Sequence, residues 1–135
     1  RRAVQEAEQL VTEGRAAVRN GDWEGVQERV GRLQEAAQKA GGRSEALLRE
    51  AAELQVQGER GKVAALRKQV MQGLQDSTSE LEAGSFRAAR KQLASATAAC
   101  NELGDDETLK RLHALRKDID MAEDKARAAG GGGPS

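Results

Sequence analysis

The sequence predicts an all-α protein, a helical bundle of about five helices in which two helix-turn-helix hairpins are joined by a long central helix. The 135-residue chain is rich in Ala, Glu, Gln, Leu, Lys and Arg, which favour helices. Tyrosine is absent, and one tryptophan and one phenylalanine are the aromatic residues, so strands lack their preferred side chains. Apolar residues recur at steps of three and four, which is the spacing of one helix face.

The first two helices are expected to form a hairpin. The apolar row of the first helix spans residues 4–18, and a turn at Asn20 and Gly21 follows. Asp22 is placed to cap the second helix, which Gly41 stops. The two rows are Val4, Ala7, Val11, Gly14 and Val18, then Trp23, Val26, Val30, Leu33, Ala37 and Ala40.

Residues 44–83 are expected to form the long central helix. Ser44 is placed to cap it, and Gly84 stops it. Gly58 and Gly61 lie in its middle, where each costs about 1 kcal/mol relative to alanine. The sequence leaves open whether this segment is one helix or breaks between the two glycines, and it favours one long, bent helix.

Two stretches of the chain share one layout. The segment GDWEGVQERV at 21–30 is matched by GSFRAARKQL at 84–93, which lies 63 residues later, so Trp23 corresponds to Phe86. The same offset turns the second row into residues that are all apolar or small: Phe86, Ala89, Leu93, Ala96, Cys100 and Leu103. This pattern is typical of a repeated hairpin that needs a neighbouring helix to cover its apolar row. Trp23 and Phe86 are expected to be the structural anchors of the two copies.

A last helix is expected after Gly104. Its apolar row is Leu109, Leu112, Leu115, Ile119, Ala122 and Ala126, and acidic residues near its start suit the positive end of a helix. We expect one all-helical domain over residues 1–129, with repeat-like units at 4–58 and 63–126. A glycine-rich flexible tail is expected at 130–135.

Residues 7–40 resemble a tetratricopeptide-type helical hairpin. Gly14 lies six residues before Asn20, and the sequence GDW follows where that family favours a glycine, a polar residue and an aromatic. The second copy keeps the aromatic and has Ala89 at the small-residue packing position. The chain therefore looks like two degenerate copies, spaced more widely than the period of about 34 residues in that family. The first copy is also similar, more weakly, to the helical region that follows von Willebrand type A domains.

The resemblance implies where a partner would bind. In tetratricopeptide arrays the first helix of each hairpin lines a concave binding face. Carried onto this chain, that face would hold Glu8, Arg15 and Arg19 in the first copy and Met71, Thr78 and Glu82 in the second. The alternative for these residues is an ordinary solvated helix face. Leu10, Leu48 and Met71 lie beside the main rows, where uncovered apolar area is expected.

The sequence offers no set of residues for catalysis or metal binding. Cys100 and His113 are the single cysteine and the single histidine, whereas a structural zinc site needs four ligands. Cys100 falls on an apolar row, which favours a buried structural cysteine over a nucleophile. We therefore expect no enzyme activity, no cofactor and no metal.

Charge and composition narrow the remaining functions. Basic and acidic residues balance at 22 each, which disfavours nucleic acid and acidic membranes as partners. The lone cysteine and the absence of an apolar signal core favour an intracellular, cytoplasmic fragment of a larger protein. The sequence predicts a non-enzymatic protein–protein interaction or scaffold module. The alternatives are a coiled-coil-like homo-oligomerisation domain that forms a homodimer through residues 44–83, and a helical nucleic-acid-binding domain.

Overall fold

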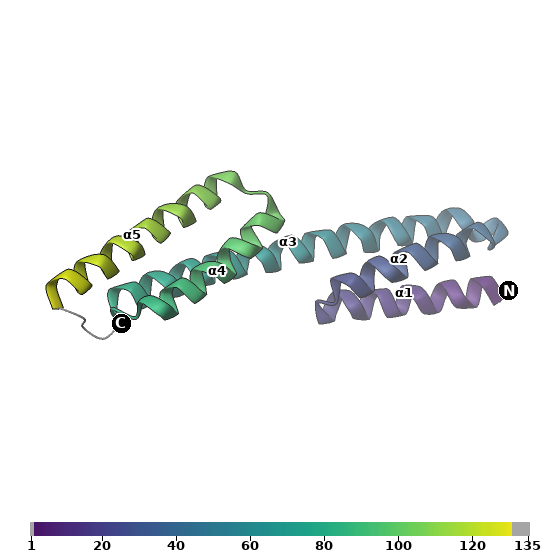
Figure 1. The fold of residues 1–135 in the computed structure, drawn as a ribbon. Coiled ribbons are helices and arrows are strands. Elements are labelled where there is room, and N and C mark those ends of the chain that lie inside the picture. Colours follow the sequence, from purple (N-terminus) through teal and green to yellow (C-terminus); the bar gives the residue numbers. More distant parts are fainter. Residues whose placement is uncertain (1, 131–135) are drawn as a thin grey trace. The chain divides into compact units, whose positions relative to one another are not determined.

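The computed structural model describes residues 2–130, and the regular elements in that range are helices. Five α-helices follow one another, and a short 3-10 turn precedes the third (Figure 1). They are α1 (Arg2–Asn20), α2 (Trp23–Gln38), η1 (Gly41–Arg43), α3 (Ser44–Glu82), α4 (Phe86–Leu103) and α5 (Asp106–Gly130). The predicted all-α class with about five helices is confirmed.

The helix ends follow from local chemistry. Gly21 and Gly84 have φ angles of 71° and 77°, in the left-handed region where glycine carries no steric penalty, so the chain can reverse there. The backbone N–H of Gly25 donates to Oδ1 of Asp22 at 3.0 Å, which confirms the predicted cap. Ser44 does not cap α3 but is its first residue, because η1 leads directly into the helix.

The end of α5 lies close to the predicted one. The helix extends to Gly130, the first residue of the predicted tail. Glycine is enriched at the C-terminal end of helices, so α5 can run to Gly130 before it ends. Residues 131–135, the rest of the predicted tail, lie outside the described part of the chain.

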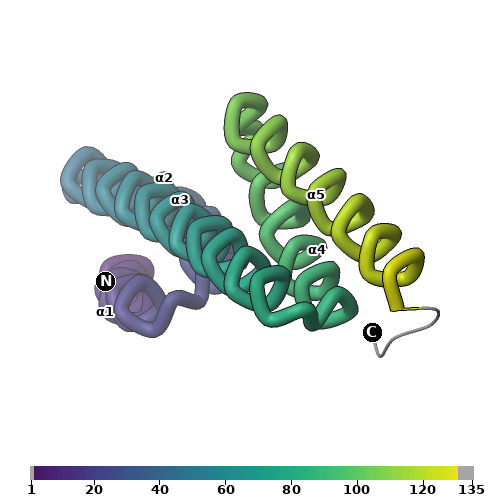
Figure 2. Tube along the Cα trace, turned by 90° about the vertical axis from the view of Figure 1, so that its left-hand side faces the viewer, coloured from purple at the N-terminus to yellow at the C-terminus, as the bar shows by residue number. Residues whose placement is uncertain are grey.

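The chain divides into a first unit, residues 1–64, and a second unit, residues 65–135. The first unit contains α1, α2 and the first half of α3, and the second contains the second half of α3, α4 and α5 (Figure 2). Each unit is therefore built from three helical segments. The third helical segment also follows the repeat. The buried Ala51 and Gly58 of α3 correspond to the buried Leu112 and Ile119 of α5, 61 residues later.

The core of the first unit is lined by all three of its helices. Its buried apolar residues are Ala7, Leu10, Val11, Ala17, Val26, Val30, Leu33, Ala36, Ala37, Leu47, Ala51 and Leu54. Leu10, where uncovered area was expected, is buried, so that expectation is wrong. The reason is that α1 packs against α2 and also against α3, where Gly14 lies against Leu54, and so buries a wider face than one stripe.

The question of a break in the central segment is settled: α3 is one continuous helix through Gly58 and Gly61. A methyl group on Gly58 would lie 2.7 Å from Cγ1 of Val26, and one on Gly61 would overlap the ring of Trp23. Both glycines therefore make room for side chains of α2. That packing offsets their cost of about 1 kcal/mol each in a helix interior.

The core of the second unit has the same plan. Its buried apolar residues are Val70, Phe86, Ala89, Leu93, Ala96, Ala99, Cys100, Leu112 and Ile119. The hydroxyl of Ser77, fully buried in α3, donates to the carbonyl oxygen of Ala89 at 2.8 Å, which satisfies the polar group. Gly73 lies against Ala96, so α3 and α4 approach closely there.

Candidate functional site

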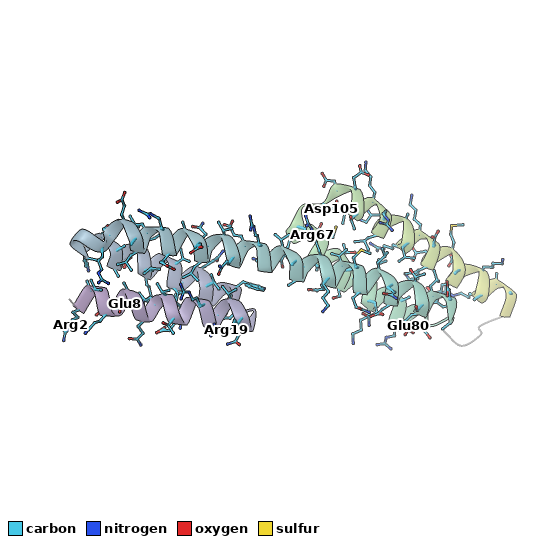
Figure 3. All side chains as sticks on the ribbon, turned by 180° about the vertical axis from the view of Figure 1, so that it is seen from behind. Arg2, Glu8, Arg19, Arg67, Glu80 and Asp105 are labelled. Atoms are coloured by element: carbon cyan, nitrogen blue, oxygen red, sulfur yellow. The ribbon has the colours of Figure 1, made fainter. Side chains whose placement is uncertain are left out.

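The candidates that the resemblance implies in the first copy all lie on α1 (Figure 3). Glu8 pairs with Arg43 at 3.3 Å, and Arg15 pairs with Glu50 at 3.1 Å. Both pairs are exposed, and they connect α1 to the segment that follows α2. Arg19 is exposed in the last turn of α1, where a positive charge suits the helix dipole. The structure thus gives Glu8 and Arg15 internal ion partners, and a partner-binding role for them stays a prediction.

The candidates in the second copy lie together on α3. Met71, Thr78 and Glu82 line one shallow groove of about 470 Å³ whose lining residues all belong to this helix. Met71 is 57% exposed, which confirms the uncovered area expected there. The hydroxyl of Thr78 donates to the carbonyl oxygen of Leu74 at 2.8 Å, so it is already satisfied within the helix.

A row of exposed apolar residues also runs along the part of α3 that belongs to the first unit. Leu48, Val56 and Val63 are 41%, 44% and 36% exposed, and their spacing of seven and eight residues places them on one helix face. The exposure of Leu48 confirms the expectation from the sequence. Pairing between chains through residues 44–83, the homodimer alternative, stays a prediction.

The first unit carries a groove between α2 and α3, here called the α2–α3 groove, of about 300 Å³. Trp23, Val26 and Val30 form its apolar part, and Gly31 opens its α2 side. The α3 side is polar, with Gln55, Glu59 and Lys62. The half-buried ring of Trp23 thus lies against Gly61 of α3 and also lines this groove.

The second unit carries a groove between α4 and α5, here called the α4–α5 groove, of about 500 Å³. Leu93 and Leu112 form its floor. The α4 side consists of small residues, Ala94, Thr97, Ala98 and Asn101, and the α5 side carries His113 and Arg116.

The two grooves occupy equivalent places in the two units. On the second helix of each unit, Gln27, Val30, Gly31 and Gln34 correspond to Arg90, Leu93, Ala94 and Thr97, 63 residues later. On the third helix Gln55 corresponds to Arg116, by the offset of 61 that also relates the buried residues. The repeat is therefore visible in the surface as well as in the core.

Arg90 closes one end of the α4–α5 groove. Its guanidinium donates to Oδ1 of Asp120 at 2.5 Å and to Oε1 of Glu123 at 2.6 Å. These two hydrogen bonds, the one to Asp120 first, raise the pKa of Arg90 above its ordinary value. The fork connects α4 to α5, because one guanidinium pairs with both carboxylates at this end of the groove.

The turn between α4 and α5 places Asp105, which is labelled in Figure 3, beside Cys100. The Cys100 thiol is buried and donates to the backbone oxygen of Asp105 at 3.3 Å. Burial raises its pKa, and the negative charges of Asp105 and Asp106 add to this effect. The hydroxyl and then the backbone N–H of Thr108 donate to the Asp105 carboxylate, which lowers the pKa of that group.

Cys100 therefore predicts a loss of stability at alkaline pH. Its pKa is raised in the folded state, so its contribution is complete below the ordinary thiol value of about 8.5 and is lost as the pH rises above it. Cys100→Ala should remove this loss, whatever constant cost the smaller side chain adds. Urea unfolding of both proteins under reducing conditions, at neutral pH and near pH 10, measures the difference. Equal pH dependence in the two proteins would contradict this prediction, because it would mean that folding does not hinder ionisation of the thiol.

Within residues 2–130, histidine, cysteine and carboxylate side chains form no group of three that could hold a metal ion. No helix in that range is both long enough and apolar enough to cross a bilayer. Comparison of the chain with protein-family models, with curated proteins and with solved structures finds no match. The likeness to tetratricopeptide hairpins thus stays a prediction from residues.

Sequence reasoning missed the two grooves. It placed the candidate site on the first helix of each hairpin, whereas these two grooves lie between the second and third helices. One signal was present: Gly31 is a glycine within the second helix but outside its apolar row, and its equivalent by the offset of 63 is the small residue Ala94.

Proposed function

We propose that this protein is a non-enzymatic protein–protein interaction module, in which the groove between the second and third helices of each unit holds a helical segment of a partner. The observation that carries the proposal is the recurrence of the groove at equivalent residues of both units. The two units differ in almost every side chain, so a packing defect in one has no reason to recur in the other.

Gly31 supports a role for the groove outside the fold. It lies in the middle of α2, where glycine costs about 1 kcal/mol relative to alanine. A methyl group at this position would meet no atom within 4 Å, unlike one on Gly58 or Gly61. The fold does not need this glycine, whereas a partner that packs closely against α2 would.

The shape of the grooves favours a helix as the occupant. A groove between two packed helices accepts the ridge of side chains on a third helix. In the α4–α5 groove the α4 wall runs from Arg90 to Asn101, roughly 16 Å at 1.5 Å per residue, which matches about three turns of a bound helix.

A selection of helical peptides from a displayed library against the full chain tests the proposal. We expect each selected peptide to lose at least about tenfold in affinity, or about 1.4 kcal/mol, when the groove that it occupies is filled. Gly31→Leu fills the α2–α3 groove, and Ala94→Leu fills the α4–α5 groove. Leucine retains the helix but fills the groove. Gln5→Leu, an equally exposed position on α1 outside both grooves, is the matched control and should leave affinity unchanged.

Circular dichroism checks that all three variants keep their helix content. Selected peptides that bind equally well to both groove variants would place the interaction elsewhere. A library that yields no binder would contradict the interaction module itself.

A further inference from the structure

The two grooves differ in charge although they occupy equivalent places. In the α2–α3 groove the charged lining residues are Glu59 and Lys62, which have opposite signs, and three glutamines complete the polar wall: Gln27, Gln34 and Gln55. In the α4–α5 groove the charged lining residues are Arg90 and Arg116, and His113 is a further polar residue on the α5 side. The second groove is thus the basic one.

Within the described residues, the unpaired positive charge of this groove is that of Arg116. Arg90 is held by Asp120 and Glu123, the carboxylates at the end of the groove. His113 and Arg116 are exposed and form no ion pair within residues 2–130. Two hydrogen-bond donors of α5 therefore face a partner without an acidic counterpart in this unit.

We propose that the α4–α5 groove binds an amphipathic helix with an acidic edge, an inference that rests on the proposed function and names the partner chemistry of one of its two sites. The apolar row of that helix packs over Leu93 and against the small side chains of Ala94 and Ala98. Its acidic edge faces His113 and Arg116, which lie three residues apart on α5, so its carboxylates are spaced by three or four residues.

The α4 wall allows a close approach of the partner backbone. Ala94 and Ala98 are exposed and lie four residues apart on one face of α4, where no long side chain blocks the groove. The fork from Arg90 to Asp120 limits the groove at one end, and the amide of Asn101 lies at the other. The binding residues thus form one surface with an apolar floor and a single basic wall.

Two stapled helical probes test this inference on the full chain. Both carry the same row of leucine and alanine, with glutamate along one edge in the acidic probe and lysine at those positions in the basic probe. Fluorescence anisotropy should show that the acidic probe binds roughly five- to tenfold more tightly than the basic one, because Arg116 attracts glutamate and repels lysine. Added salt should reduce the difference.

Arg116→Glu identifies the groove. We expect it to abolish the preference for the acidic probe and to favour the basic one. Arg111→Glu makes the same charge change at an exposed position of α5 outside the groove and should leave the preference intact. Ala94→Leu should weaken both probes, because it fills the apolar part.

The failures of the inference and of the proposed function can be told apart. Equal binding of both probes, lost in Ala94→Leu, would overturn the acidic partner while the groove keeps its function. An acidic probe that does not bind, or that binds as well to Arg116→Glu, would also overturn the inference. The peptide selection against the Gly31 and Ala94 variants then decides the proposed function independently.

Discussion

Replacing Phe86 with alanine is expected to lower the free energy of unfolding by roughly 3–5 kcal/mol. Phe86 is 7% exposed and lies in the core cluster of the second unit, where it supplies the largest apolar side chain. Removing the ring takes away its burial and leaves a cavity that the surrounding helices can close only in part. Because α4 begins at this residue, the loss also loosens the start of the helix.

Urea unfolding followed by the helical circular dichroism signal measures this effect. Phe86→Leu is the matched control and should cost under about 1.5 kcal/mol, because it keeps most of the apolar volume. Trp23→Ala should cost less than Phe86→Ala, about 2–3 kcal/mol, because Trp23 is only partly buried and borders the α2–α3 groove. A Phe86→Ala protein with unchanged stability would show that the ring does not anchor the second unit.

The fold could be predicted because helical spacing and chain breaks are local properties. The row Val26, Val30, Leu33 and Ala37, and its equivalents at an offset of 63, are buried as expected. The turns at Gly21 and Gly84 use a left-handed backbone. Glycine is the residue that adopts this conformation most readily, so its position in the sequence indicates the turn. These features need no knowledge of which helix packs against which.

The sequence favoured a continuous α3, which is confirmed, but it could not exclude a break between the two central glycines. Gly58 and Gly61 have the composition of a break, and only the positions of Val26 and Trp23 on another helix show that they are packing sites. The burial of Leu10 was missed in the same way, since it depends on how the neighbouring helices cover α1. Tertiary contacts override local preference at these residues.

The grooves were harder to predict than the core. The apolar rows that contain Leu93 and Leu112 show which residues of α4 and α5 are buried. A groove depends instead on which side chains leave space between the two helices. Ala94 and His113 have no distinguishing pattern in the sequence, and they become neighbours only because α4 and α5 pack together. The resemblance to tetratricopeptide hairpins directed attention to α1 instead, where Glu8 and Arg15 form internal ion pairs.

Substitutions at Gly73 and Gly31 are expected to have opposite signs. A methyl group on Gly73 would lie 2.7 Å from Cβ of Ala96 and 3.0 Å from the backbone oxygen of Gln92, neither of which can move without shifting α4. Gly73→Ala should therefore destabilise the protein by about 1–3 kcal/mol, and Gly73→Leu by about 3 kcal/mol or more. Gly31→Ala, with open space around it, should stabilise by up to about 1 kcal/mol.

Urea unfolding of Gly73→Ala, Gly73→Leu, Gly31→Ala and Gly31→Leu is compared with that of the unchanged chain. The comparison decides between packing and function at these two glycines. A stabilising Gly73→Ala would contradict the close approach of α3 and α4. Gly31→Leu then separates the two roles, because it should stabilise the free protein through helix propensity and still weaken a partner in the α2–α3 groove. Stability that rises while binding falls is the result expected if Gly31 serves the partner, whereas a loss of both would mean that the fold needs this glycine.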